Sequence, residues 1–218
     1  MMRKLVIWGA SGHALVIADI IRLQGEYELV GFLNDLNPER QGTEFCGLPI
    51  FGGREQLAHL QRLGVQLLIL GFGNCRLRLE LSALVKAKGF QLATAIHPRA
   101  VVAAGVPIGP GTVIVAGAVV NPGAKIGENV IINTCASVGH ECIVEDGAHI
   151  APGVRLGGKA RVGQATWVGI GATVKECVNI GKYSVIGAGA VVLKDIPDGV
   201  VAYGVPARII REVTPDDI

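Results

Sequence analysis

A six-residue periodicity runs through the second half of the chain without interruption. Every sixth residue from Val102 to Val192 is aliphatic, which makes sixteen in a row. Half of the chain is hydrophobic, so a chance run of this length has a probability on the order of one in 10⁵. The residue two places before each aliphatic position is small or β-branched, and the residue after it is glycine in eight of the sixteen units.

This period is the sequence signature of a parallel β-helix, in which each unit forms one short strand and one turn. Three units close a triangular coil of about eighteen residues, so the series predicts about five coils. We expect the aliphatic residue to point into the prism, the small residue to fit its corner, and glycine to relieve the crowded turn. The register has no insertion. We expect a β-helix at residues 98–202 and a C-terminal tail at 203–218.

The first half of the chain alternates between predicted strands and helices. Strands are expected at residues 5–8, 27–33, 66–70 and 91–96, and helices at 14–21, 54–63 and 76–88. Such alternation indicates a parallel α/β sheet. A unit of about 95 residues is roughly half of a dinucleotide-binding fold. We therefore expect a Rossmann-like nucleotide-sugar-binding domain at residues 1–97.

The turn GASGHA, from Gly9 to Ala14, joins the first strand to the first helix and is a candidate phosphate site. Backbone amides at a helix start bind anions. The dinucleotide fingerprint is incomplete, because Leu15 occupies the place of a third glycine, and a tight turn without ligand is the alternative. Asp35 and Asn74 follow other strands at the same predicted edge, where α/β sheets bind ligands, although single residues there are often turn formers or caps.

Composition limits the classes of partner. The net charge of +2 gives no reason to expect binding to nucleic acid or to an anionic membrane. Residues 101–120 carry no charge but contain glycines and prolines and alternate in polarity, so no membrane insertion is expected. The N-terminal apolar run is too short for a signal peptide. Five cysteines without a CxxC pair are typical of reduced thiols, and we expect a cytoplasmic protein.

Two histidines, His140 and His149, interrupt the apolar repeat. They are nine residues apart, about half a turn of an eighteen-residue coil, so they should face different sides of one chain. They could meet only across a subunit interface, as in a trimer that brings one histidine from each neighbour into each cleft. Glu141 follows His140, and a carboxylate beside an imidazole favours its charged form. That pairing suits a general base; a packing or surface histidine is the alternative.

Metal and thiol chemistry are weaker interpretations of the same stretch. A catalytic zinc site generally takes three protein ligands, and the repeat contains only His140 and His149. Cys135 and Cys142 flank His140, but neither shows a sequence sign of activation. Cys142 stands in the small-residue series, which indicates a packing residue. We therefore expect no metal and no acyl-cysteine intermediate.

Nearly the whole chain, about residues 3–211, resembles bacterial sugar acetyltransferases with a left-handed β-helix. The resemblance is carried by GASGHA, GFLND, LGFGN, IHP, INTCASVGHEC and YGVPARII. These proteins include nucleotide-linked 4-amino-sugar N-acetyltransferases of surface glycan biosynthesis and sialic acid O-acetyltransferase-like proteins. The left hand of the β-helix and the homotrimer are implied by this resemblance, since a period of six shows neither.

The resemblance also implies roles for particular residues. His140 would be the general base, and Glu141 would raise its basicity. The residues that would bind the co-substrate acetyl-CoA are His149 at the thioester, with Gly158, Ile170 and Ala188 along the groove. The residues that would bind the nucleotide-sugar are Ser11, Gly12, His13, Asn34, Asp35, Gly73 and Asn133. One departure is that the second strand ends in Asn34-Asp35 where the family often has two acidic residues, which puts the usual base or sugar preference in doubt.

The implied reaction is direct acetyl transfer from acetyl-CoA to the C4 amine of a nucleotide-linked amino-deoxy sugar. His140 would take the proton, and backbone amides near Gly158 would stabilise the oxyanion. Three alternatives remain: O-acetylation of sialic acid or a related hydroxyl, a non-catalytic nucleotide-sugar-binding trimer, and a nicotinamide oxidoreductase, which leaves the repeat without a role. Lys182 and Arg208 are either ligands of CoA phosphates or solvated charges, and the tail segment GVPARII either covers the coenzyme or stabilises the trimer.

Overall fold

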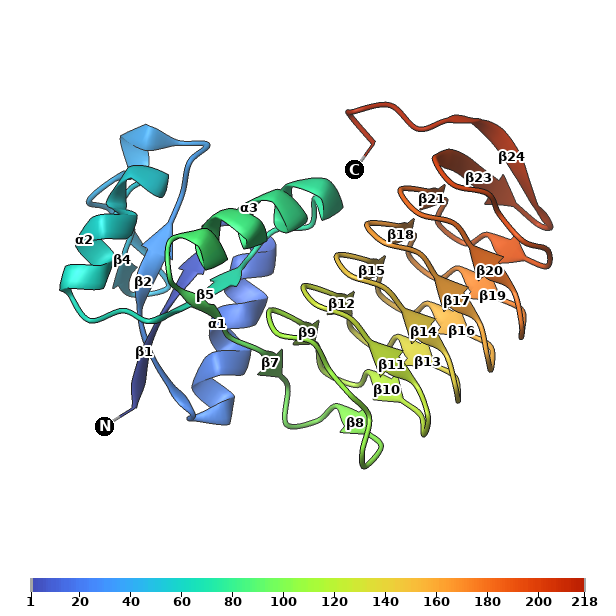
Figure 1. The fold of residues 1–218 in the computed structure, drawn as a ribbon, viewed down its shortest axis with the longest axis horizontal. Coiled ribbons are helices and arrows are strands. Elements are labelled where there is room, and N and C mark those ends of the chain that lie inside the picture. Colours follow the sequence, from blue (N-terminus) through green and yellow to red (C-terminus); the bar gives the residue numbers. More distant parts are fainter. Residues whose placement is uncertain (1, 218) are drawn as a thin grey trace.

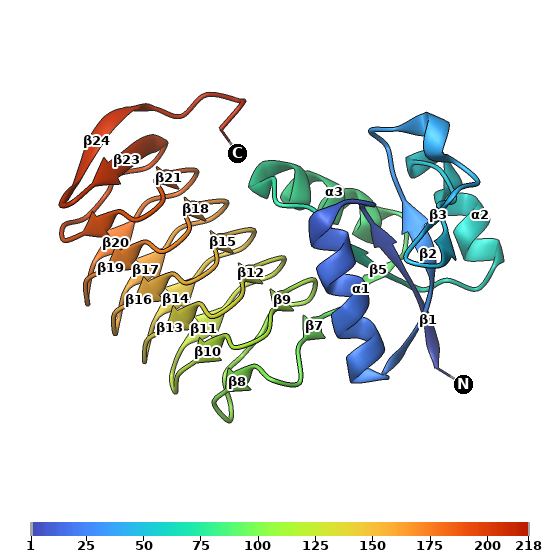
Figure 2. The same ribbon diagram turned by 180° about the vertical axis from the view of Figure 1, so that it is seen from behind.

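The computed structural model describes residues 2–217, which form a small α/β unit joined to a triangular β-helix (Figure 1). The chain crosses from one to the other once, near residue 95, and then winds along the prism to its far end. Viewed from behind, helices α1 (Gly12–Gln24) and α3 (Cys75–Ala87) lie on the side of the unit nearer the prism (Figure 2). Over these residues, none of the helices combines the length and hydropathy needed to cross a membrane.

Four parallel strands form the sheet of the α/β unit. Their order is β2 (Tyr27–Leu33), β1 (Arg3–Trp8), β5 (Leu67–Leu70) and β6 (Gln91–Leu92). The central strands are continuous apolar runs because helices cover both faces of the sheet. Alternate residues of β1 pack on opposite sides: Ile7 packs with α1, and Val6 packs with α3 and with α2 (Leu57–Arg62).

The sequence prediction is accurate for most of this unit and wrong at its end. The expected strand at 91–96 is divided: β6 closes the sheet, whereas β7 (Ala95–Ile96) pairs with β9 (Val113–Ile114) of the β-helix. One apolar stretch therefore contributes a strand to the α/β sheet and a strand to the β-helix. Its hydrophobic pattern does not show where the chain passes from one domain to the other. The expected helix at 54–63 is divided into a 3₁₀ turn, Arg54–Gln56, and α2. Also unpredicted are the 3₁₀ turn Pro38–Arg40 and the hairpin β3 (Glu44–Phe45) and β4 (Leu48–Pro49).

The β-helix has three faces of short strands stacked in parallel. The first face, which lies against the α/β unit, contains β7, β9, β12 (Ile131–Ile132), β15 (His149–Ile150), β18 (Trp167–Val168), β21 (Val185–Ile186) and β23 (Val200–Gly204). The second face contains β8 (Val101–Val102), β10 (Val119–Val120), β13 (Ser137–Val138), β16 (Arg155–Leu156), β19 (Thr173–Val174) and β22 (Val191–Val192). The third contains β11 (Lys125–Ile126), β14 (Ile143–Val144), β17 (Arg161–Val162) and β20 (Asn179–Ile180).

The aliphatic series forms the core of the prism, as predicted. From Ile114 to Val192 each of its members is at most 4% exposed. Strands eighteen residues apart pair in register, as Ile132 does with Ile150. Six strands are stacked on the second face, so the β-helix has about six coils instead of the expected five. The difference arises because pairing extends beyond the series, to Ile96 before it and Ile196 after it.

The glycines that follow the aliphatic residues let neighbouring coils approach each other closely. They do not form the turn. A Cβ on Gly139 would lie 2.7 Å from the carbonyl oxygen of Leu156 in the next coil, which leaves no room for a side chain. The left-handed backbone conformation falls two residues later, at Glu141, whose φ is 57°. The expected relief of crowding by glycine is therefore found between coils.

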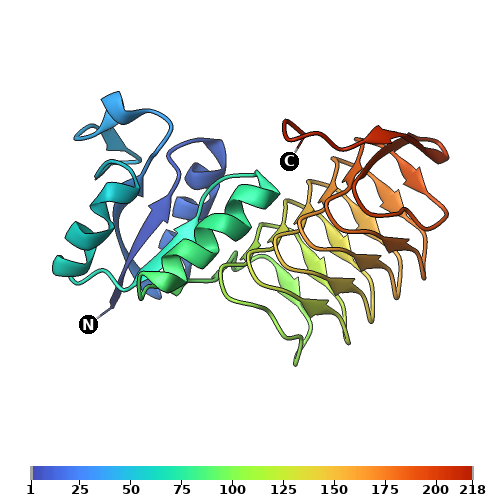
Figure 3. The same cartoon turned by 45° about the horizontal axis from the view of Figure 1, so that its top comes forward.

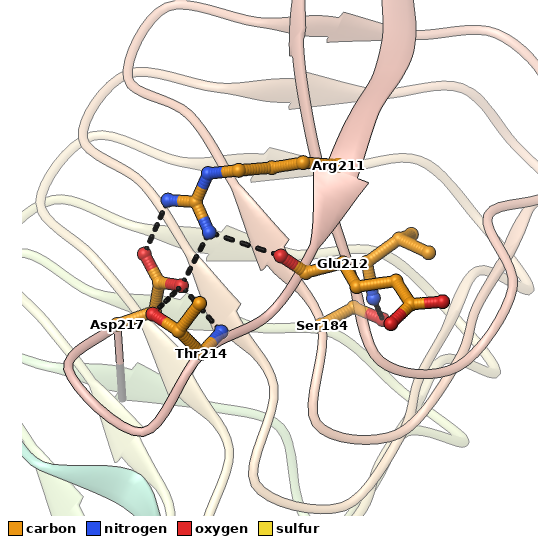
Figure 4. A network of polar contacts seen from close by, with 6 residues as sticks. Ser184, Arg211, Glu212, Thr214 and Asp217 are labelled. Carbon is orange, nitrogen blue, oxygen red and sulfur yellow. Dashed lines mark hydrogen bonds and ion pairs between the residues drawn. The ribbon is translucent and has the colours of Figure 1, made fainter.

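A hairpin of β23 and β24 (Ala207–Glu212) closes the far end of the prism. The chain after it bends back and is fixed by an ion pair between Arg211 and Asp217, with distances of 2.6 and 2.7 Å between the paired atoms (Figure 4). The amide of Thr214 also donates to Asp217 Oδ2, at 2.7 Å. The tail thus ends in a closed turn that Arg211 holds to the end of β24.

Candidate active site

His140 lies on the edge of the prism that follows the second face, two residues beyond β13. Its side chain is exposed, and its Nδ1 lies 3.0 Å from Glu141 Oε2. Lys159 Nζ lies 3.7 Å from the same oxygen. A carboxylate at Nδ1 favours the tautomer with the proton on Nδ1 and leaves Nε2 as the acceptor. The ring can therefore take a proton at Nε2 from a group that approaches along this edge.

Gly158 lies one coil further along the same edge, directly beside the His140 ring. A Cβ at Gly158 would come within 2.7 Å of His140 Cε1 and closer still to Nε2. Only glycine lets the imidazole rest on the backbone there. Among residues 2–217, the Gly158 amide donates no hydrogen bond. The structure thus brings together His140, Glu141 and Gly158, with a proton acceptor beside an unpaired amide.

His149 has the opposite environment, on the first face and against the α/β unit. It is 5% exposed, its ring centroid lies 4.3 Å from that of Trp167, and its Nε2 lies 3.2 Å from Asn133 Nδ2. The His13 ring lies 6.4 Å away. Burial, aided by the positive charge of Arg78, lowers the pKa of His149 to about 3 and that of His13 to about 4. Both imidazoles are therefore neutral at neutral pH.

The four residues expected at acetyl-CoA do not line one groove within a single chain. Gly158 follows the second face, whereas Ile170 and Ala188 follow the first face and are adjacent in the stack, where the Gly189 amide donates to the Ile170 carbonyl at 2.8 Å. Only residues eighteen apart return to the same edge of the prism, and Gly158 and Ile170 are twelve apart. The two histidines also face different sides, as the spacing predicts.

A pocket of about 520 Å³ opens at the carboxyl ends of β1, β2 and β5. Its lining includes three residues expected to bind the nucleotide-sugar, Ser11, Asn34 and Asp35. The others lie elsewhere. Gly12 is exposed at the start of α1. His13, Gly73 and Asn133 lie around His149 at the boundary between the two domains.

Several lining residues of this pocket had no signal in the sequence. Arg40 Nη1 donates to the Ala10 carbonyl in the glycine turn at 2.8 Å, and its guanidinium lies 5.6 Å from the centroid of the Phe45 ring. Arg54 forms a 2.9 Å ion pair with Asp35. Arg40 comes from the segment between β2 and the expected helix at 54–63, which has no regular periodicity, and Arg54 is the first residue of that expected helix.

The geometry also shows the roles of Asn74 and Cys142. Asn74 lines the pocket and caps α3, because its Oδ1 accepts from the Leu77 amide at 2.8 Å. Cys142 is buried in the prism with its Sγ 3.1 Å from the Gly157 carbonyl, and burial raises the pKa of its thiol. It is therefore a packing residue.

Within residues 2–217, no cluster of three or more His, Cys, Asp or Glu side chains is placed to hold a metal ion.

Two family descriptions match separate parts of the chain. The PglD N-terminal domain matches residues 4–85, which include the pocket of the α/β unit and three of the four strands of its sheet, β1, β2 and β5. The bacterial transferase hexapeptide (six repeats) matches residues 123–158 and 159–194, which include His140, His149 and Gly158. Curated relatives match only within a short region. Galactoside O-acetyltransferase from Escherichia coli is 50% identical over 56 residues, 26% of this chain, and the chain spans 28% of its length.

Solved structures match nearly the whole chain. A histidine-to-asparagine variant of perosamine N-acetyltransferase from Caulobacter crescentus, in complex with CoA and GDP-perosamine, is 36% identical over 97% of this chain and 99% of its own, with a TM-score of 0.91. The acetyltransferase domain of PglB from Neisseria gonorrhoeae, in complex with acetyl coenzyme A, is 36% identical over 96% and 100%, with a TM-score of 0.90. The chain therefore belongs to the family of hexapeptide-repeat acetyltransferases that carry a PglD-type N-terminal domain, which is the acyltransferase class expected from its sequence.

Proposed function

We propose that this protein transfers the acetyl group of acetyl-CoA to the C4 amine of a nucleotide-linked amino-deoxy sugar, in cytoplasmic steps of bacterial surface glycan biosynthesis. One observation carries the proposal: His140 is paired at Nδ1 with Glu141, and its Nε2 lies beside Gly158, whose amide donates no hydrogen bond among residues 2–217. Similar proteins support the two substrates, since one binds CoA with GDP-perosamine and another binds acetyl coenzyme A.

The reaction proceeds in one chemical stage without a covalent enzyme intermediate. The sugar amine attacks the thioester carbonyl, so that a C–N bond forms and the C–S bond breaks. His140 Nε2 takes the proton from the attacking nitrogen and returns it to the leaving sulfur, which departs as the CoA thiol. Glu141 stabilises the imidazolium that forms in between. The Gly158 amide donates to the developing oxyanion, and one such donor contributes about 3 kcal/mol in other acyl transfers.

The pocket of the α/β unit holds the nucleotide of the acceptor. Helix α1 has no acidic residue in its first turn, so the positive end of its dipole stays available for a diphosphate. Arg40 brings a guanidinium to the same turn through its contact with Ala10, and arginine matches phosphate oxygens geometrically. Ser11 and Asp35 line the walls. Anchoring the nucleotide there tethers the sugar amine for attack.

A homotrimer completes the coenzyme groove. One edge of the prism carries His140 and Gly158, and a different edge carries Ile170 and Ala188 beside the face of His149. Threefold symmetry places the first edge of each subunit against the second edge of a neighbour and closes three equivalent grooves. Subunit mixing tests this arrangement: two inactive variants, His140→Ala and Ile170→Arg, should regain part of the wild-type turnover when refolded together. No gain on mixing would contradict a shared site.

The acceptor is tested by release of free thiol from acetyl-CoA against a panel of nucleotide-linked 4-amino sugars. We expect turnover with one amino sugar and none with the matching 4-hydroxyl sugar. Turnover with the hydroxyl sugar alone would replace the amine by a hydroxyl acceptor. Nucleotide-sugar binding without any affinity for acetyl-CoA would contradict the transferase and favour a binding protein.

A further inference from the structure

Arg78 is a buried cation at the boundary between the α/β unit and the β-helix. It extends from the first turn of α3 and is 1% exposed. Buried arginines are usually paired with carboxylates, but among residues 2–217 no Asp or Glu pairs with this guanidinium. The charge is compensated instead by backbone carbonyl oxygens.

These carbonyls come from both domains. On the side of the α/β unit, Nη1 donates to the carbonyls of Gly73 and Phe72, the latter at 3.3 Å. On the side of the β-helix, Nη2 donates to Gly147 at 2.7 Å and Nε donates to Asn129 at 3.2 Å. A guanidinium is planar and its donors form a rigid fork. One side chain therefore holds two loops, from residues about seventy apart in sequence, at a fixed separation.

Both loops lead to residues of the proposed active site. Gly73 packs on the indole of Trp167, where an added Cβ would lie 3.3 Å from the ring, and belongs to the loop that follows β5. Gly147 lies two residues before His149, at the start of β15. The Arg78 bridge therefore connects the edge of the sheet that lines the nucleotide pocket to the strand that carries His149.

The other contacts of α3 with the β-helix include Leu79, whose side chain lies beside Gly147, and two polar contacts further along the helix. Ser82 Oγ accepts from Asn129 Nδ2 at 2.9 Å, and Lys86 pairs with Glu128 at the surface. Helix α3 thus runs alongside the prism (Figure 3). None of these contacts joins the Gly73 loop to the Gly147 loop by hydrogen bonds, as Arg78 does.

We infer that Arg78 is a positioning residue that sets the distance between the nucleotide pocket and β15, the strand that carries His149, by bridging the Gly73 and Gly147 carbonyls. The inference rests on the proposed function. The acceptor is anchored in one domain, and the groove that it must reach belongs to the β-helix. Loosening the bridge leaves each ligand bound but displaces the sugar amine from the thioester. A displacement of about 1 Å can lower a rate by about 10²-fold.

The test compares Arg78→Met, Arg78→Lys and Lys86→Ala. The methionine keeps most of the apolar stem but makes none of the hydrogen bonds of the guanidinium, and the lysine keeps the charge without the fork. Lys86→Ala removes a contact between the domains on the same helix and leaves the bridge intact. For each variant, kcat and KM are measured with acetyl-CoA and the accepted sugar. Dissociation constants for CoA and for the nucleoside diphosphate are measured separately by calorimetry.

Tryptophan fluorescence reports directly on the contact between the two domains. The chain has two tryptophans. In a Trp8→Phe background, the tryptophan emission comes from Trp167, which packs on Gly73. We expect Arg78→Met to lower kcat by about 10- to 100-fold, with both dissociation constants within threefold and a red shift of Trp167 emission. Arg78→Lys should give a smaller loss of kcat, and Lys86→Ala none.

Wild-type kcat in folded Arg78→Met, or an unshifted Trp167 emission, would overturn the inference. If Arg78→Met does not fold, Arg78→Lys decides by the same comparison, and wild-type kcat in that variant would also overturn it. If wild-type protein fails to turn over any amino sugar, the proposed function fails. The emission shift and the separate dissociation constants then still test the bridge.

Discussion

His140 and His149 belong to the same coil, yet the structure gives them opposite surroundings. His140 is exposed on an edge, with a carboxylate at Nδ1 and a glycine beneath its ring. His149 is buried between the domains, against Trp167, and burial lowers its pKa to about 3. The residue type is the same, so solvent and neighbours decide what each ring can do. An outward edge suits proton transfer, whereas the face turned to the α/β unit suits packing and orientation of a neutral ring.

The largest effect should follow from removing the exposed ring. We expect His140→Ala to lower kcat by about 10²- to 10⁴-fold, because a positioned general base contributes that much to acyl transfer. The acetyl-CoA dissociation constant should change little, since the proton acceptor acts mainly in the transition state. Thiol release under saturating substrates measures the loss, and size-exclusion chromatography controls for assembly. Near-normal turnover in an intact assembly would place the base elsewhere.

A second substitution displaces the same ring without changing it. We expect Gly158→Ala to lower kcat by about 10²-fold, because the new Cβ would overlap the His140 imidazole and force it aside. Gly105→Ala is the matched control: that residue also lies in the β-helix, at a φ of 76° with no atom within 4 Å of an added Cβ. The control should cost about 1 kcal/mol of stability through backbone strain and leave kcat unchanged. Equal kcat values in the two variants would contradict the close contact.

The buried ring should instead affect stability, and in a definite direction with pH. The pKa of His149 in the folded protein is about 3, below the ordinary value of 6.5. Between these values the unfolded chain binds a proton that the folded chain does not, so stability falls as pH decreases from 6.5 towards 3. At pH 5 this amounts to about 2 kcal/mol. We expect His149→Gln, compared with wild type by urea unfolding at pH 7.5 and pH 5, to lose less stability on acidification. Equal losses in both proteins would show that His149 is not held neutral.

The sequence predicts each region only as far as its contacts are local. The coils form from contacts eighteen residues apart, and a period of six fixes which residues those are, so the inward series and the opposed histidines could be predicted. The edge residues His140 and Glu141 are adjacent in the chain, so their pairing was also visible. Gly158 lies eighteen residues, or one full coil, after His140, so the period places it beside the His140 ring. Its role was implied only by the resemblance to the family.

The boundary between the domains had no such signal. Arg78 bonds to Gly147, and nothing in the sequence of α3 distinguishes it from Arg76 two residues earlier. His13 was expected with the nucleotide but lies beside His149, because the turn before α1 faces both the pocket and the prism. Arg40 reaches the glycine turn from an irregular segment. Contacts between domains depend on how two separately periodic units dock, and neither period contains that information.

The smallest effect should come from the C-terminal turn. Hydrogen bonds from Arg211 and Thr214 hold the pKa of Asp217 below its usual range, so the carboxylate is charged and the turn is fully formed throughout the neutral range. The Arg211 side chain of the pair is about half exposed to solvent, so the pair contributes little to global stability. We expect Asp217→Asn to speed proteolytic clipping after residue 212 and to leave kcat unchanged. Asp216→Asn, which breaks no ion pair among the described residues, should do neither. If instead Asp217→Asn raises the KM for acetyl-CoA, the tail covers the coenzyme and belongs functionally with the edge of His140.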